Sequence, residues 1–87
     1  MTINDVIHKY DGQNLKIQTR MLEPDEESEY PYLLIEGTAE ALRKLAELIM
    51  AIPEDDIGTK LSMSPNGAGS AHFTKNSTIG LYINCIE

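Results

Sequence analysis

The chain has 87 residues, a net charge of −7 and one cysteine, and these totals exclude several classes of protein. A chain of this length forms one domain, residues 1–87, whose thin core leaves little room for an enclosed substrate cleft, so no enzyme is expected. The excess of acidic residues repels phosphate backbones and disfavours nucleic acid as a partner. With one cysteine, no secretion signal and no long apolar run, the chain is expected in the cytoplasm, without disulfide or membrane contact.

The first third of the chain is predicted to form two strands and an acidic loop. Residues 6–10 precede an Asp-Gly turn signal and are expected to pair as an N-terminal strand. Residues 15–20 alternate between core-facing and polar side chains, which predicts a second strand whose buried side Met21 continues. Residues 23–29 carry acidic side chains and nothing apolar to bury, so they are expected to form an exposed loop.

The middle of the chain is predicted to hold a buried strand and the main helix. Residues 33–35 form a short apolar run, which indicates a strand more buried than the one before it. Thr38 is expected to cap a helix over residues 38–52, which Pro53 ends. This helix should bury one apolar face and expose two ion pairs at i,i+4 spacing. The apolar face consists of Leu42, Leu45, Ala46, Ile49 and Ile52, and the ion pairs are Glu40 with Lys44 and Arg43 with Glu47.

The last third of the chain is predicted to be mostly strand. Residues 61–63 alternate as in a half-buried strand, residues 68–74 favour a short strand over an ordered loop, and residues 78–86 show the longest alternation. The expected fold is α+β, with one amphipathic helix packed on a mostly antiparallel sheet of about four to six strands. The other sheet face is left to solvent or to a partner. That open face carries Lys16, Gln18, Arg20, Lys60, Ser62, Tyr82 and Asn84.

No residue pattern carries a catalytic or metal-binding signature. Cys85 shares the alternation of its strand and is interpreted as a buried structural thiol, and His72 as a surface or turn histidine. The carboxylates lack the spacing of a calcium loop, and residues 67–70 lack the ending of a phosphate-binding loop. No catalytic residue, metal or cofactor is therefore predicted. A small enzyme or ligand-binding protein that uses His72 with residues 67–70 stays open as an alternative.

The acidic loop is the strongest candidate for a binding surface. Its carboxylates create a negative field beside two tyrosines, and aromatic residues flanked by charge are common in protein interfaces. A solvated loop that only keeps the domain soluble is the simpler interpretation, and it stays open. The predicted contacts are Glu23, Asp25, Glu26, Glu27, Glu29, Tyr30 and Tyr32, with Tyr82 and Asn84 on the open sheet face as the second choice.

Residues 33–48, Leu-Leu-Ile-Glu-Gly-Thr-Ala-Glu-Ala-Leu-Arg-Lys-Leu-Ala-Glu-Leu, resemble the small single-helix immunity proteins of bacterial polymorphic toxin systems. In that family a strand ending in Ile-Glu-Gly enters a helix rich in Leu-Ala-x-Leu, and residues 61–64 and 76–83 are similar to its two terminal strands. The family's histidine-rich strand is here residues 61–63, without histidine. The resemblance covers residues 31–86 and implies a cytoplasmic protein that neutralises a cognate toxin by tight protein–protein binding.

An acidic binder of this kind suits a basic toxin, such as a nuclease, whose cationic surface it would cover. The alternative is a small interaction or homo-oligomerisation module of unknown partner. Such a module would use the open sheet face or a strand edge to form a homodimer.

Overall fold

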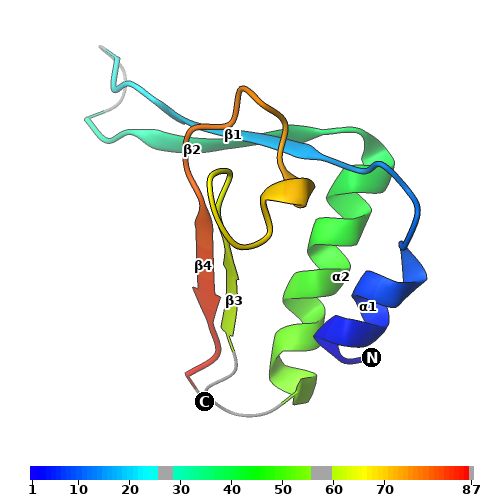
Figure 1. The fold of residues 1–87 in the computed structure, drawn as a ribbon. Coiled ribbons are helices and arrows are strands. Elements are labelled where there is room, and N and C mark those ends of the chain that lie inside the picture. Colours follow the sequence, from blue (N-terminus) through cyan, green and yellow to red (C-terminus); the bar gives the residue numbers. More distant parts are fainter. Residues whose placement is uncertain (26–28, 56–59, 87) are drawn as a thin grey trace.

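The computed structural model describes residues 1–25, 29–55 and 60–86, which form two α-helices, one 3-10 turn and four strands (Figure 1). In chain order the elements are α1 (Ile3–Lys9), β1 (Ile17–Leu22), β2 (Tyr32–Gly37), α2 (Ala39–Asp55), β3 (Lys60–Met63), η1 (Ser70–His72) and β4 (Leu81–Asn84). β1 pairs antiparallel with β2, and β3 pairs antiparallel with β4, in two separate sheets. The α+β class is confirmed, but two helices and two small sheets take the place of the single helix and single sheet that the sequence predicted.

Residues 3–9 form helix α1, so the predicted N-terminal strand over residues 6–10 is wrong. Thr2 begins the helix with a reciprocal capping box, in which the Thr2 hydroxyl accepts the amide of Asp5 at 3.2 Å. The Asp5 carboxylate in turn accepts the amide of Thr2 at 2.9 Å. This pair satisfies two amides that a short helix would otherwise leave unbonded. Val6 and Tyr10 are buried, and α1 packs on α2.

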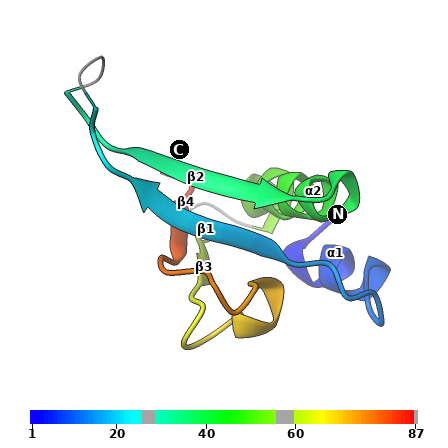
Figure 2. The ribbon, with the colours of Figure 1, turned by 90° about the horizontal axis from the view of Figure 1, so that it is seen from above.

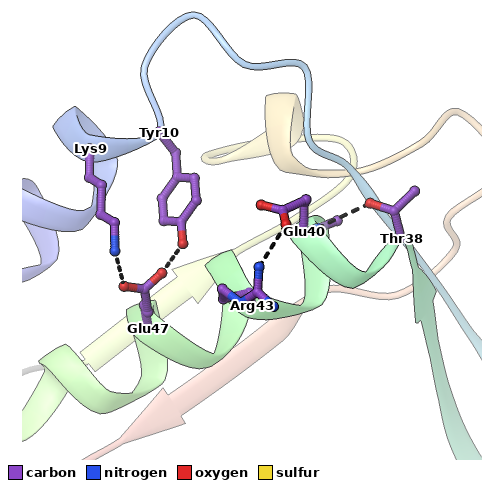
Figure 3. Close-up of polar contacts among 7 residues, drawn as sticks. Lys9, Tyr10, Thr38, Glu40, Arg43 and Glu47 are labelled. Atoms are coloured by element: carbon purple, nitrogen blue, oxygen red, sulfur yellow. Dashed lines mark hydrogen bonds and ion pairs between the residues drawn. The ribbon is translucent and has the colours of Figure 1, made fainter.

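Thr38 caps α2 as predicted. Its hydroxyl oxygen accepts the amide of Ala41 at 3.1 Å (Figure 3), and its carbonyl accepts the amide of Leu42 at 2.9 Å. The helix does not end before Pro53 but continues through it to Asp55. A proline removes one amide donor, and in the last helical turn this loss does not stop the helix.

The side of α2 that enters the core is turned from the predicted one. Leu45 and Ile52 are buried as expected, but Leu42, Ala46 and Ile49 are exposed. Both sides of α2 carry apolar residues at three- and four-residue steps, and packing against the other elements decides between them. The residues buried along α2 are Ala41, Lys44, Leu45, Leu48, Ala51 and Ile52.

Glu47 on α2 joins the two helices. Its carboxylate accepts a hydrogen bond from Lys9 Nζ at 2.5 Å and another from the hydroxyl of Tyr10 (Figure 3). Arg43 pairs with Glu40, 2.6 Å away on the same helix. Both i,i+4 ion pairs predicted for this helix are therefore wrong. Glu40 pairs with Arg43 and not with Lys44, and α1 supplies the partners of Glu47.

β1 has hydrogen-bond partners along both edges. On the side away from β2, residues 73–79 run beside it: the amide of Thr74 donates to the carbonyl of Ile17, and the amide of Thr78 donates to the carbonyl of Thr19, each at 2.8 Å. The amide of Thr19 donates to the Ser77 hydroxyl at 3.1 Å, and the Thr19 hydroxyl donates to the carbonyl of residue 79. Thr19 is 0% exposed. This buried polar network fixes β1, and with it the β1–β2 hairpin, to the body of the protein.

The same network explains two wrong predictions in the last third of the chain. Residues 70–72 form the 3-10 turn η1, followed by a single bridge between Phe73 and Ile17, where a strand over residues 68–74 was expected. The predicted long strand over residues 78–86 is only β4, four residues long. The residues before β4 bond to β1 largely through hydroxyl side chains, so they do not extend the β3–β4 ladder.

The relative burial of the first two strands is the reverse of the prediction. β1 contributes buried Ile17 and Thr19, whereas β2 has no fully buried residue. Met21, expected on the buried side of β1, is exposed. The core lies between α1, α2, β1 and the β3–β4 sheet. Its buried hydrophobic residues are Val6, Tyr10, Ile17, Ala41, Leu45, Leu48, Ala51, Ile52, Leu61, Met63, Phe73 and Leu81.

Candidate functional site

The β1–β2 hairpin extends away from the body of the protein (Figures 1 and 2); at its outer end residues 23–25 follow β1 and residues 29–31 precede β2. The last pair of the ladder is Leu22 opposite Tyr32, so residues on either side of the loop leave the sheet at the same place. Tyr30 is 74% exposed and Tyr32 is 60% exposed, values that leave most of each ring available for contact. We call the described residues at this end the hairpin tip. It consists of Glu23, Asp25, Glu29, Tyr30 and Tyr32, all exposed.

The hairpin tip combines charge with aromatic surface. Glu23 and Asp25 follow the last residue of β1. Glu29 and Tyr30 precede β2, and Tyr32 is its first residue. The pairing of the two strands therefore brings both groups to one end of the hairpin. Carboxylates at a protruding end are attracted to a cationic surface, and exposed tyrosines supply rigid contact area there. Glu26 and Glu27, also predicted as contacts, lie outside the described residues.

The second predicted surface is separate from the hairpin tip. Tyr82 and Asn84 are exposed on β4, which belongs to the other sheet (Figure 1). The Tyr82 ring lies beneath the ammonium of Lys60, with Nζ 5.5 Å from the ring centre. Because β1–β2 and β3–β4 form two sheets, the polar residues expected on one open sheet face do not share a single sheet. Gln18, one of them, accepts a hydrogen bond from the Thr74 hydroxyl at 3.3 Å.

A small pocket, which no sequence pattern predicted, lies at the opposite end of β1. It is bounded by the α1–β1 connection, by α2 and by η1, and has a volume of about 260 Å³. A smaller cavity of about 10 Å³ lies towards the core, and Leu15, Lys44 and His72 line both spaces. The residues lining the outer pocket are Ile7, Tyr10, Asp11, Gly12, Gln13, Asn14, Leu15, Lys16, Lys44, Ala71 and His72.

Two basic side chains in this pocket are partly withdrawn from water. Lys44 is only 9% exposed, and among the described residues its ammonium has no hydrogen bond or ion pair. Burial lowers the pKa of Lys44. Burial, and then the charge of Lys44, lower the pKa of His72. Nδ1 of His72 is buried and has no hydrogen-bond partner among the described residues. His72 therefore lies in a turn, one of the two places predicted for it, and is partly buried there.

Lys44 was predicted as an exposed partner of Glu40, and the available signal was ambiguous. It lies three residues after Ala41 and four before Leu48, the spacing of a core position on α2. A lysine at such a position is more often assigned to the solvent side, because a buried unpaired ammonium is costly. The pocket is found only when the chain folds η1 against α2.

Two further observations concern chemistry elsewhere in the chain. Cys85 is partly buried and packs against the hydrophobic core, close to the predicted structural role. Across residues 1–25, 29–55 and 60–86, no three His, Cys, Asp or Glu side chains are grouped as a metal would require. In the same ranges, neither helix combines the length and apolarity needed to cross a bilayer.

Comparisons with protein-family models, with curated proteins and with solved structures find no match for this chain. The function is therefore argued from the hairpin tip and its surroundings.

Proposed function

We propose that this protein is an immunity protein that neutralises a bacterial toxin by tight binding, with the hairpin tip as its main contact surface. The observation that carries the proposal is the gathering of three carboxylates and two exposed tyrosines at the protruding end of the β1–β2 hairpin. The protein acts by binding and not by catalysis, and it acts in the cytoplasm. The resemblance of residues 31–86 to single-helix immunity proteins supports the same function, and α1 lies outside that stretch.

The physical properties of the hairpin tip suit a cationic partner. A chain with fourteen acidic and seven basic residues attracts a basic protein at long range, and carboxylates at the tip direct the partner to that end. Tyrosine is enriched among interface residues that carry binding energy, since its ring buries a large area at little entropic cost. The Thr19 network holds β1 rigid, so the hairpin loses little freedom on binding.

The first experiment identifies the partner. The tagged chain is used to capture proteins from a lysate of its native host at low and high salt, and each captured protein is then expressed with and without this chain. The proposal predicts one basic protein that stays bound at high salt, stops growth when expressed alone, and is harmless when this chain is present. A captured protein that is harmless alone, or equally toxic with this chain, contradicts it.

Matched variants then test the hairpin tip itself. Replacing Tyr30 and Tyr32 together by Ala is expected to weaken binding by a factor of ten or more, since interface tyrosines commonly contribute more than about 1.4 kcal/mol. Tyr82→Ala on β4 is the control, because Tyr82 is exposed to a similar extent, 63%, and belongs to the other sheet. Equal losses of affinity from both changes, or a loss confined to Tyr82→Ala, would show that the interface does not lie at the hairpin tip.

A homo-oligomerisation module is the second candidate, and β2 favours it. Within the described residues, no strand pairs with the outer edge of β2, and Leu33 on that strand is exposed. An open strand edge can pair with the same edge of a second copy. Light scattering coupled to size-exclusion chromatography distinguishes the two functions: a dimer that is lost when Leu33 or Ile35, whose amides face the open edge, is replaced by Pro supports the module, while a monomer at high concentration excludes it.

A further inference from the structure

The pocket between the α1–β1 connection, α2 and η1 contains basic groups that the proposed function does not use. Lys16 stands immediately before β1, whereas the hairpin tip follows Leu22 at the other end of the same strand. Both views place η1 and the α1–β1 connection on the same side of β1 (Figures 1 and 2). The pocket is thus a second feature, separate from the predicted protein-binding surface.

The lining of the pocket is rich in hydrogen-bond donors. Lys16 and Lys44 carry ammonium groups, His72 adds an imidazole, and Gln13 and Asn14 add side-chain amides. Of the described residues, Asp11 is the only one that brings a carboxylate to the pocket lining; Tyr10, which also lines it, donates its hydroxyl to Glu47. The chain as a whole has a net charge of −7, whereas the lining of this pocket has more basic than acidic side chains.

Lys44 and His72 are the groups that most require a partner. Among the described residues, Lys44 has no counter-charge and the buried imidazole nitrogen of His72 has no hydrogen bond, and both conditions raise the free energy of the folded state. Their positive charges also repel each other when both are protonated, which is why Lys44 contributes to the lowered pKa of His72. A bound anion would lower the cost at Lys44 and the cost of the charge repulsion, because it would accept from the ammonium and pair with the imidazolium.

We propose that this pocket binds a small oxyanion, a phosphate or carboxylate group, through Lys44 with His72 and Lys16 beside it. The outer volume of about 260 Å³ is below the range of drug-sized ligands, so it suits a single anionic group or a small molecule that carries one. The inner cavity of about 10 Å³ admits nothing larger than one water molecule, so the anion is held in the outer space.

Binding is expected to strengthen as the pH falls. An anion beside His72 favours its protonated form and raises its pKa, so the complex takes up a proton that the free protein lacks. The titratable groups around His72 in the pocket are Asp11 and Lys16 from the α1–β1 connection and Lys44 from α2. Histidine is the side chain whose charge ordinarily changes near neutral pH, so His72 is expected to set the pH dependence.

The test is a titration of the folded protein with inorganic phosphate, and separately with acetate, followed by amide chemical shifts at constant ionic strength in chloride. The proposal predicts saturable shifts in residues 12–16 and at Lys44, Ala71 and His72, with a raised His72 pKa in the saturated protein. Saturation by phosphate alone or by acetate alone defines the group that is bound. Shifts that stay linear with both anions, or that spread over the whole surface, overturn the proposal.

A matched pair of variants separates the pocket from general charge effects. Lys44→Met keeps the length of the side chain and removes its charge, and it should weaken binding roughly tenfold or more, the factor expected for one charge-assisted hydrogen bond. Lys75→Met makes the same charge change at an exposed residue and should alter the affinity less than about twofold. Equal weakening by both variants overturns the proposal. If Lys44→Met does not fold, His72→Gln serves instead, and it should abolish the pH dependence of binding.

Discussion

Replacing Thr19 by Val tests whether the buried hydroxyl network holds the hairpin to the body. Valine keeps the shape and the β-branching of threonine, so packing and strand propensity are preserved. The change removes the donor to the carbonyl of Ile79 and leaves that acceptor unsatisfied beside a residue that is 0% exposed. An unsatisfied buried partner costs about 1–3 kcal/mol. Since the new methyl group regains part of this through burial, we expect a net loss of about 1–2 kcal/mol.

Urea denaturation followed by circular dichroism measures this loss directly. For a domain of this size the same change lowers Tm by roughly 4–15 °C. Thr78→Val is the control, because Thr78 is exposed and its hydroxyl lies 3.5 Å from its acceptor, so its loss should stay within about 0.5 kcal/mol. A Thr19→Val protein as stable as the wild type, or a Thr78→Val protein equally destabilised, would refute the role assigned to the network.

Three further changes probe the core, a close backbone contact and one ionisable group. Leu48→Ala should cost about 2–5 kcal/mol in urea denaturation, because Leu48 is fully buried, and a loss below about 1 kcal/mol would contradict its central place in the core. Gly80→Ala should destabilise by about 1–3 kcal/mol, since its Cβ would lie 2.5 Å from the carbonyl oxygen of Met63, whereas Gly67→Ala, with no atom nearer than 3.7 Å, should have little effect. Stability should fall as the pH drops through the ordinary histidine pKa of 6.5, because burial lowers the pKa of His72 and the unfolded chain then binds the proton more readily. His72→Gln should remove this fall, and an unchanged pH profile in that variant would assign it to another group.

Local patterns were sufficient where one feature dominated a segment. The Thr38 cap and the alternation of Leu61 and Met63 predicted the start of α2 and the strand β3. The run of carboxylates predicted an exposed loop, and the described residues of the hairpin tip are exposed. These residues were found as a group because they are neighbours in the sequence.

Competing signals led to the wrong elements elsewhere. The Asp-Gly pair suggested a hairpin and outweighed the Thr2–Asp5 capping box that begins α1. On α2, the choice of buried side depends on α1, β1 and the β3–β4 sheet, none of which a helical period can reveal. The pairing of β1 with residues 73–79 combines two backbone hydrogen bonds with bonds made by hydroxyl side chains of both segments, and alternation of apolar residues carries no record of such bonds.

The pocket illustrates the same limit. Lys44 and His72 are distant in the sequence and meet only because η1 folds beside α2. Each residue alone had a simple interpretation, an exposed lysine and a turn histidine. The spacing of Lys44 on α2 was that of a core position, but its proximity to His72 and the missing partners of their polar atoms among the described residues are properties of the fold.

Growth rescue is the decisive test of whether the hairpin tip binds and neutralises a toxin. Cells that express the captured partner would be supplied with the wild-type chain, with the Tyr30→Ala and Tyr32→Ala double variant, or with Tyr82→Ala, each at equal level. We expect growth with the wild type and with Tyr82→Ala, and arrest with the double variant. Full rescue by a folded double variant would contradict it.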